Sequence, residues 1–270
     1  MTSVTRPHAY EAVTESGLYR SLNQRLLTFA ALPPGARVLD LGCGTGSLAE
    51  LAVERGDLEV VAADPDPEMV AAARARLGPG VEVIEASAAT FASFVEAGSL
   101  DAVLLANAIH LVPDIDALLA DAGRVLRPGG TVAFNTAFFD GAGDPADQPL
   151  YWRLVLDARK HVRRDRSARR DRPLAKRALD ADVYRSALAA AGFTQIDIAT
   201  ETVELPADLL SAIVSSPMFA GGALPGADPD QAARALVQAL HRLVRARPGV
   251  RVRRRWLFAT ARSPQEVSTE

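Results

Sequence analysis

The chain has 270 residues, of which 49% are hydrophobic and 23% charged, and its formal net charge is −3 at pH 7. This length and composition predict a folded chain that buries a full core, which excludes a disordered or fibrous protein. No apolar run approaches the roughly 20 residues that a membrane-spanning helix needs, so we expect no membrane partner. The first residues lack the apolar stretch of an export signal, and we therefore expect a cytoplasmic protein.

Strands and helices alternate along the chain. This order predicts an α/β fold: a doubly wound, Rossmann-like, seven-stranded, mostly parallel sheet with helices on both faces. We expect the strands near residues 36–41, 58–63, 81–85, 101–106, 131–138, 194–204 and 251–261. We expect the helices near residues 18–31, 46–56, 67–77, 114–126, 179–191 and 229–246.

The first predicted strand runs into three alternating glycines, Gly42, Gly44 and Gly46, and then into a helix. Because glycine permits positive φ and has no Cβ, a ligand can lie against the backbone and the start of the helix. Asp40 places a carboxylate at the end of this strand, which suits a ligand with an amino group and repels a pyrophosphate. Cys43, the only cysteine, is expected to be a small residue tolerated between two glycines.

The same loop also fits the looser fingerprint of a dinucleotide cofactor over residues 44–49. Asp64 ends the second predicted strand about 20 positions further on, where a carboxylate holds ribose hydroxyls. This residue suits both classes of cofactor. Asp40 and Gly42 are not required by the dinucleotide pattern, and they favour the class with an amino group.

The run from Val38 to Gly46 resembles the first motif of the class I S-adenosylmethionine-dependent methyltransferases of the small-molecule type. Residues 59–64 resemble the second strand of that family, residues 101–107 the fourth strand, and residues 125–130 the turn into the fifth. The resemblance covers about residues 36 to 136. It implies S-adenosylmethionine as cofactor, S-adenosylhomocysteine as product, and methyl transfer as the reaction.

The resemblance also implies which residues hold the cofactor. Asp64 would hold the ribose hydroxyls, with Pro65 and Met69 near the adenine. Where the family often has an Asp near the adenine amino group, this chain has a serine, Ser87, which can still make one hydrogen bond. The full set expected at the cofactor is Asp40, Gly42, Cys43, Gly44, Gly46, Asp64, Pro65, Met69, Ser87, Ala88 and Asn107.

The fourth predicted strand ends in residues 107–110, where the acceptor usually meets the methyl group in this fold. His110 is the candidate general base, because an imidazole with a pKa of about 6.5 can take a proton from a hydroxyl or amine. The alternative is a structural histidine behind the cofactor. Tyr10 and Tyr19 resemble lid aromatics whose rings contact the sulfonium, with plain packing as the other interpretation. The strand end lacks the acidic residue of metal-dependent catechol methylases, so we expect no metal.

Three segments lie outside the predicted sheet within what we expect to be one methyltransferase domain, residues 1–270. They are N-terminal lid helices (1–32), a basic cap insertion (140–178) and a second loop insertion (205–228), which we expect to cover the substrate. The second insertion equally fits a plain connecting loop. Between Arg153 and Arg177 the chain has eleven basic residues and three acids, a net charge of +8. Such a block attracts an anionic partner or forms a solvated face.

The sequence therefore predicts methyl transfer to an oxygen, nitrogen or carbon nucleophile of a small anionic metabolite, which is compatible with secondary metabolism. One alternative is an RNA methyltransferase whose arginine block grips phosphates, although the strand end lacks the Pro-Pro-aromatic sequence of base methylases. A third hypothesis is a cofactor-binding protein that performs a non-methylating reaction such as cyclisation. The acceptor and the oligomeric state, including a homo-oligomer, stay open.

Overall fold

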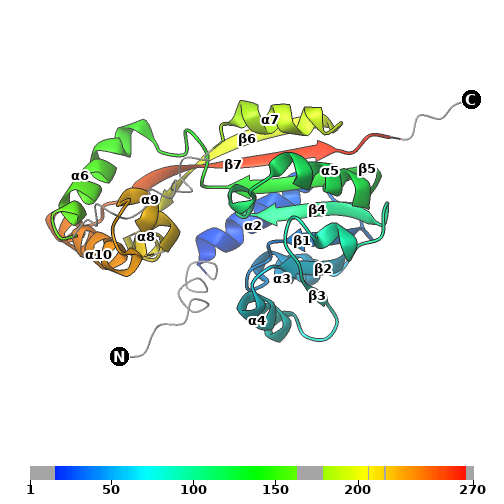
Figure 1. Cartoon of the computed structure of the whole chain (residues 1–270), viewed down its shortest axis with the longest axis horizontal. Helices are drawn as coiled ribbons and strands as arrows, with labels where there is room; N and C mark the ends of the chain where they lie inside the picture. Colours follow the sequence, from blue (N-terminus) through cyan, green and yellow to red (C-terminus); the bar gives the residue numbers. More distant parts are fainter. Residues whose placement is uncertain (1–15, 163–178, 206, 216, 266–270) are drawn as a thin grey trace, which may run out of the picture. The chain divides into compact units, whose positions relative to one another are not determined.

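The computed structural model describes residues 16–162, 179–205, 207–215 and 217–265, and Figure 1 shows their secondary structure. The chain divides into two compact units. The sheet unit consists of Thr14–Phe139, Leu179–Thr200 and Leu257–Glu270. The helical unit consists of Met1–Val13, Asp140–Ala178 and Glu201–Trp256.

The described residues form a seven-stranded sheet in the order β3-β2-β1-β4-β5-β7-β6. The first five strands pair in parallel, and β7 runs antiparallel to β5, which confirms the mostly parallel sheet that the sequence predicts. The strands are β1 (Arg37–Leu41), β2 (Glu59–Asp64), β3 (Glu82–Glu85), β4 (Leu100–Ala106), β5 (Leu126–Thr136), β6 (Thr194–Leu205) and β7 (Val252–Arg262).

The order of the strands reverses between β1 and β4, which lie side by side although they are not consecutive. In doubly wound sheets, ligands bind in the crevice beyond the carboxyl ends of the strands at such a reversal. Both strands are apolar runs buried on both faces, and Leu39 and Leu104 are 0% and 1% exposed. This burial fixes the register of the two strands, and therefore the position of the loops that follow them.

The helices of the sheet unit cover both faces of the sheet (Figure 1). Three of these helices pack in a row, since α2 contacts α3 and α3 contacts α4. Two others, α5 and α7, contact each other. Asp66, Asp114 and Asp180 cap the starts of α4, α5 and α7 by accepting hydrogen bonds from backbone amides. The helices are α2 (Gly17–Ala30), α3 (Ser47–Glu54), α4 (Pro67–Leu77), α5 (Ile115–Val125) and α7 (Ala181–Ala190), with 3-10 turns η1 (Phe91–Ser93) and η2 (Ile109–Leu111).

The described part of the helical unit is organised around one long helix, α10 (Pro229–Ala246), which contacts α6 (Gln148–Arg159), α8 (Ala207–Ser215) and α9 (Pro217–Ala223). A 3-10 turn, η3 (Pro145–Asp147), precedes α6. The inner face of α10 is apolar, with Leu236 and Leu240 among its buried residues. This face supplies the local core of the unit.

All seven expected strands and all six expected helices are present. The largest difference is at β5, which begins at Leu126 rather than near residue 131. Gly192 has φ +85°, as the turn after α7 requires. The second insertion, however, is not a plain loop, because it contains α8 and α9.

The glycines and prolines of that insertion hid its two helices in the sequence. Apolar side chains of the segment, including Leu209, Val214 and Leu224, are buried, and both helices contact α10. Tertiary burial of this kind outweighs a weak local propensity.

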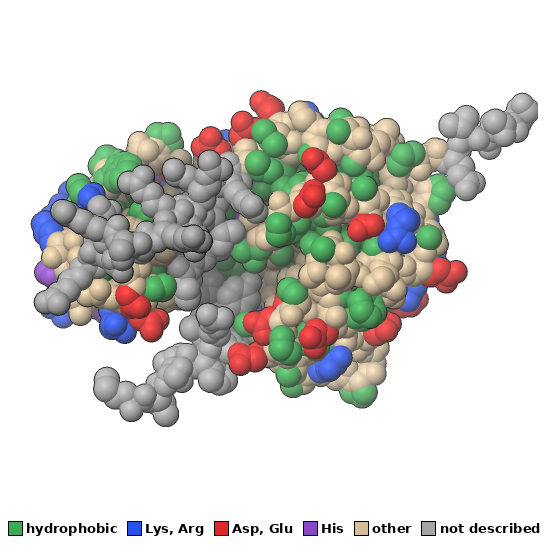
Figure 2. All heavy atoms as spheres, in the orientation of Figure 1, with side chains coloured by type: hydrophobic (Ala, Val, Ile, Leu, Met, Phe, Trp, Pro, Cys, Tyr) green, Lys and Arg blue, Asp and Glu red, His purple; other side chains and the backbone are tan. Residues whose placement is uncertain are grey.

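Basic and acidic side chains are unevenly distributed over the molecule. On the face drawn in Figure 2, acidic side chains are scattered over the sheet unit, whereas Lys and Arg gather near α6 and α10. Among the residues that the structure describes, no helix is both long and apolar enough to cross a membrane.

Candidate functional site

The loop between β1 and α3 has the backbone geometry that its glycines predict. Gly42, Gly44 and Gly46 all have positive φ, at +75°, +54° and +85°. Gly42 N donates a hydrogen bond of 2.7 Å to Ala63 O at the end of β2. A Cβ on Gly42 would lie 2.8 Å from the Cβ of Ala108, which follows β4. The loop is therefore held close to the ends of both neighbouring strands, where only glycine fits.

Asp40 is a buried carboxyl group at the end of β1, only 1% exposed. Its Oδ2 accepts a hydrogen bond of 3.1 Å from Ala49 N in α3. Its Oδ1 has no hydrogen-bond partner among the described residues. Burial raises the pKa of Asp40 to about 7, opposed by the hydrogen bond from Ala49 and reinforced by the charge of Asp64. An unsatisfied buried oxygen of this kind fits a cationic or hydrogen-bond-donating ligand.

Asp64 is the carboxylate at the end of β2, and it is 8% exposed. Its Oδ2 accepts from Gly44 N and its Oδ1 from Asp66 N, each at 2.9 Å. Burial raises the pKa of Asp64, and these two hydrogen bonds oppose the shift. The carboxylate is thus fixed between the glycine loop and the turn into α4. Pro65 is exposed in that turn, and Met69 is half-buried on α4.

Two further polar groups belong to the glycine loop. Cys43 is buried, and burial raises the pKa of its thiol, so the reactive thiolate is disfavoured. Thr45 is 1% exposed, and its hydroxyl has no hydrogen-bond partner within the described part of the chain. The loop therefore combines an unreactive small side chain with an unsatisfied hydroxyl.

The segment after β3 forms a tight local turn. Ser87 Oγ lies 3.1 Å from Thr90 Oγ1 and accepts a hydrogen bond of 3.2 Å from Ala89 N. Ala86 N donates to Asp64 O at 3.1 Å, which ties this turn to β2. Ser87 and its neighbour Ala88 are half-buried. The serine hydroxyl is used within the turn.

Asn107 joins three elements at the carboxyl end of β4, and its φ is +51°. Its Oδ1 accepts from Ala137 N at 3.0 Å, and its Nδ2 donates to Tyr19 Oη at 3.1 Å. Its own amide donates to Asn135 Oδ1 at 2.8 Å. Tyr19 is 7% exposed and belongs to the core. Of the two tyrosines expected to line a lid, Tyr19 therefore packs in the interior, and Tyr10 lies outside the described residues.

His110 follows on η2 and is half-buried. Its Nδ1 lies 3.1 Å from Thr136 Oγ1, and its ring centroid is 4.5 Å from that of Phe138. Thr136 Oγ1 also accepts a hydrogen bond of 2.9 Å from Phe138 N. A hydroxyl oxygen has two lone pairs, so in the tautomer protonated at Nδ1 Thr136 accepts from Nδ1–H as well, and Nε2 is then the proton acceptor of the imidazole.

Thr136 and Asn135 were missed by the sequence analysis. Both are buried at the carboxyl end of β5, beside the end of β4. Asn135 Nδ2 has no hydrogen-bond partner among the residues that the structure describes. The signal was two consecutive polar residues at the end of an apolar strand, in a fold that binds ligands at strand ends.

Two arginines at the start of β7, Arg253 within it and Arg251 just before it, form ion pairs. Arg253 Nε lies 3.0 Å from Asp147 Oδ2 and 3.8 Å from Asp144 Oδ2, and Arg251 pairs with Glu204 at 3.3 Å. The hydrogen bonds from Arg253 lower the pKa of Asp147. Of the eleven basic residues in the first insertion, Arg153, Arg159 and Lys160 are described and eight are not. The described residues hold no cluster of three His, Cys, Asp or Glu side chains that could bind a metal.

Comparison with known proteins identifies a segment of the sheet unit. The family model described as "Methyltransferase domain" matches residues 38–130, the segment from β1 to the turn within β5. The chain carries a class I methyltransferase domain. This family uses S-adenosylmethionine, and the match spans the glycine loop and the ends of β2 and β4 described above.

The chain is also similar to individual methyltransferases. An uncharacterized methyltransferase of Mycobacterium tuberculosis is 40% identical over 144 residues, which are 52% of this chain and 53% of that protein. The chain thus spans about half the length of this curated relative.

Solved structures share the fold at low sequence identity. A phosphoethanolamine N-methyltransferase of Haemonchus contortus, solved with phosphomonomethylethanolamine and S-adenosylhomocysteine, is 20% identical with a TM-score of 0.60, covering 97% of this chain and 57% of that one. The [4+2]-cyclase SpnF is also 20% identical, with a TM-score of 0.54, covering 91% and 82%. The fold alone does not decide between these reactions.

Proposed function

We propose that this chain transfers a methyl group from S-adenosylmethionine to an oxygen, nitrogen or carbon nucleophile of a small anionic metabolite. The observation that carries the proposal is the glycine loop at the reversal of strand order. Its positive-φ glycines lie between two buried carboxyl groups, Asp40 and Asp64, inside the matched methyltransferase segment. The unsatisfied Oδ1 of Asp40 suits an amino group, which a nicotinamide dinucleotide does not offer there.

The expected residues other than Cys43 each have a proposed role in holding the cofactor. Asp40 binds the amino group through Oδ1, and Asp64 accepts hydrogen bonds from the ribose hydroxyls through its remaining lone pairs. The backbone of the glycine loop lies against the methionine part. Pro65, Met69, Ser87 and Ala88 surround the adenine, and Asn107 shapes the end of β4 beside it. When bound, the cofactor supplies an electrophilic methyl group on a sulfonium.

The protein contributes mainly by position, since an in-line displacement requires the reacting atoms about 3 to 3.5 Å apart. His110 acts as general base and takes the acceptor's proton at Nε2. Thr136 orients this imidazole by accepting a hydrogen bond from Nδ1–H. Tyr10 is proposed to contact the sulfonium with its ring, as the resemblance implies.

An anionic acceptor is supported by charge. The helical unit contains 20 Lys and Arg residues against 12 Asp and Glu, a net charge of +8. A basic surface raises the local concentration of an anion and speeds its association. The Haemonchus contortus enzyme was solved with a phosphate-bearing molecule, which is consistent with this class of acceptor.

A second candidate function is a non-methylating reaction that keeps the cofactor. The similarity in fold to a [4+2]-cyclase favours it, because the same cofactor fold there belongs to an enzyme named for ring closure. In that case Asp40 and Asp64 would still bind the cofactor. No methyl group would be transferred, so His110 would have no role as the general base of a methyl transfer.

The test is parallel calorimetric titration of the protein with S-adenosylmethionine, S-adenosylhomocysteine and NAD. We expect about micromolar binding of the first two and no binding of NAD. Asp64→Ala should weaken binding by about 1.5–3 kcal/mol, because hydrogen bonds to a charged group are lost. Binding of NAD alone would overturn the proposal.

Activity is tested in the same preparations with methyl-labelled cofactor and pools of carboxylate, phosphate and phenolate acceptors. Label should enter an anionic acceptor. His110→Ala should reduce this turnover while leaving the affinity for S-adenosylhomocysteine unchanged. Cofactor binding without label transfer to any pool would favour the cyclase-like alternative.

A further inference from the structure

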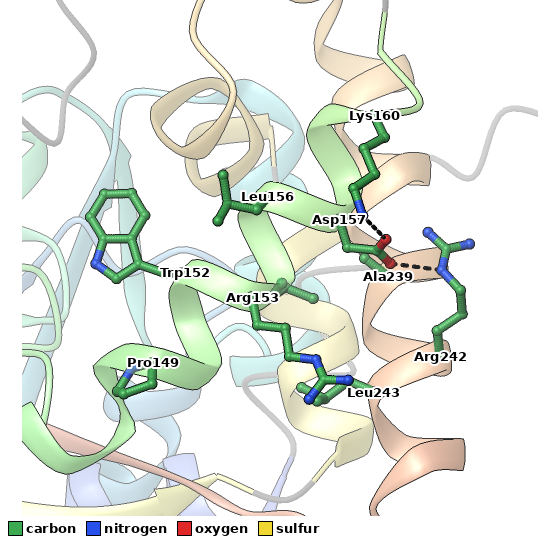
Figure 3. A pocket seen from close by; sticks show the side chains of 10 residues that line it. Pro149, Trp152, Arg153, Leu156, Asp157, Lys160, Ala239, Arg242 and Leu243 are labelled. Atoms are coloured by element: carbon green, nitrogen blue, oxygen red, sulfur yellow. Dashed lines mark hydrogen bonds and ion pairs between the residues drawn. The ribbon is translucent and has the colours of Figure 1, made fainter.

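A groove in the helical unit lies between α6 and α10 and has a volume of about 600 Å³. Figure 3 shows it from close by. The residues that line it come only from these two helices and the residue that follows α6: Pro149, Trp152, Arg153, Leu154, Leu156 and Asp157, with Lys160, Ala239, Arg242 and Leu243. None of them belongs to the candidate methyltransferase site.

The groove carries more positive than negative charge. Asp157 pairs with Arg242 Nε at 2.7 Å and with Lys160 Nζ at 3.6 Å. Arg153 has no ion pair with any residue that the structure describes, and in Figure 3 its side chain extends toward Leu243. Arg242 and Lys160 thus share one carboxylate and Arg153 has none among the described residues, so the three cations and one carboxylate of the groove give it a net charge of +2.

The walls of the groove are apolar beneath these charges. Ala239 and Leu243 on α10 and Leu154 on α6 are buried beside it. Leu156 and Trp152 on α6 are 54% and 53% exposed, which is unusual for side chains of their size. In Figure 3, Trp152 projects from α6 on the side away from Arg242, so apolar surface continues past the rim.

We propose that this groove binds an amphiphilic anion: a carboxylate or phosphate monoester joined to an apolar chain. The anionic group pairs with Arg153, and the apolar chain lies on Leu154, Leu243 and Leu156. A volume of about 600 Å³ lies within the range of small-molecule sites. A simple inorganic anion would leave the apolar walls exposed to water. A nucleic acid backbone would bring phosphates against Asp157.

The inference concerns the helical unit alone and does not rest on methyl transfer. It is therefore tested by direct binding in the absence of S-adenosylmethionine. The full-length protein is titrated with decanoate, decyl phosphate and decanol, in calorimetry below the micelle concentration of each. We expect saturable binding of one molecule of either anion and much weaker binding of decanol. A preference for decyl phosphate assigns a phosphate group, and the reverse preference assigns a carboxylate.

Two arginine variants separate a site from general attraction. Arg153→Gln removes the cation without an ion pair, and decanoate affinity should fall about tenfold, as expected for a lost charge-assisted hydrogen bond. Arg245→Gln is the matched control, because Arg245 is an exposed arginine of α10 that does not line the groove. An equal loss in both variants, equal binding of decanol, or no binding at all would overturn the inference.

Asp157→Asn tests from the opposite direction whether the positive charge of the groove binds the anion. The substitution removes the carboxylate that competes for Lys160 and Arg242, so the folded variant should bind decanoate severalfold more tightly. Circular dichroism and a thermal melt establish that each variant is folded. Unchanged or weaker binding by folded Asp157→Asn contradicts the proposed site, and Arg153→Gln keeps the test decisive where Asp157→Asn does not fold.

Discussion

At the scale of single residues, the site depends on carboxyl groups held in the interior. Asp40 is satisfied on one oxygen only. Asp64 accepts two backbone hydrogen bonds, yet burial still raises its pKa. Burying a carboxylate whose oxygens are not all hydrogen-bonded reduces the free energy of unfolding, and such carboxylates are concentrated where ligands bind. Asp40 therefore lowers the stability of the cofactor-free protein whenever it is ionised.

This cost predicts a specific dependence of stability on pH. The pKa of Asp40 is about 7 in the folded protein against 3.8 for an ordinary aspartate, so the unfolded chain loses this proton first as pH rises. The contribution of Asp40 is thus fully present below about pH 4 and is lost as pH rises through about 7. Asp40→Asn cannot ionise. Relative to the variant, the wild type should lose about 3–4 kcal/mol of unfolding free energy over this range.

The measurement is denaturant unfolding of both cofactor-free proteins at several pH values from about 4 to 8. Asp64, Asp147 and Asp157 are present in both proteins, so the difference between the two curves reports the ionisation of Asp40 together with its charge interaction with Asp64. Parallel curves would show that Asp40 does not titrate in this range. Addition of S-adenosylhomocysteine, which carries the amino group, should reduce the difference.

At the scale of elements, the β1–loop–α3 connection is fixed by its close contact with the end of β4. Gly42 combines positive φ with a neighbour too close for a Cβ. Gly98 also has positive φ, at +65°, but no atom lies within 4 Å of the position that a Cβ would take there. A Cβ at Gly98 would therefore meet backbone strain alone, whereas a Cβ at Gly42 would meet both backbone strain and steric overlap.

Gly42→Ala should destabilise the protein more than Gly98→Ala. Backbone strain at positive φ costs on the order of 1 kcal/mol at both positions. The overlap with Ala108 adds about 1–3 kcal/mol at Gly42 only. Adding Ala108→Gly to Gly42→Ala should remove the overlap and restore a loss close to that of Gly98→Ala. Thermal melts of the wild type and the three variants check this order, and a double variant no better than Gly42→Ala would contradict it.

The elements also show where sequence patterns succeed. The strands and helices of the sheet unit have long apolar or amphipathic patterns with clear caps such as Asp66 and Asp180, and they were predicted. The helices α6, α8 and α9 were not. These helices are short and lie within insertions rich in charge, proline or glycine, and all three contact α10, a tertiary contact that a local pattern does not reveal.

At the scale of the whole molecule, charge is segregated between the two units. The sheet unit has 10 basic and 21 acidic residues, a net charge of −11, and the helical unit has a net charge of +8. The overall charge of −3 conceals this difference. Each unit should therefore interact with ions of opposite sign independently of the total.

Chromatography at low salt checks this segregation. We expect retention both on an anion exchanger, through the sheet unit, and on heparin, through the helical unit, at pH 7. The logarithm of the affinity for heparin should fall linearly with log salt concentration, because binding releases counterions. A protein of the same net charge whose acidic and basic residues were evenly distributed would not be retained on a heparin column. Flow-through on heparin at low salt would also remove the main support for the RNA alternative.

The sequence by itself determined the fold of the sheet unit and its candidate cofactor loop. These features depend on local patterns: apolar strands, three glycines at fixed spacing, and a carboxylate at the end of each of two strands. The tertiary structure decided which side chains meet. Asn107 with Tyr19, and His110 with Thr136, come together only because β4 and β5 pair in register. The groove between α6 and α10 likewise joins residues about 80 positions apart, and no local pattern contains such a contact.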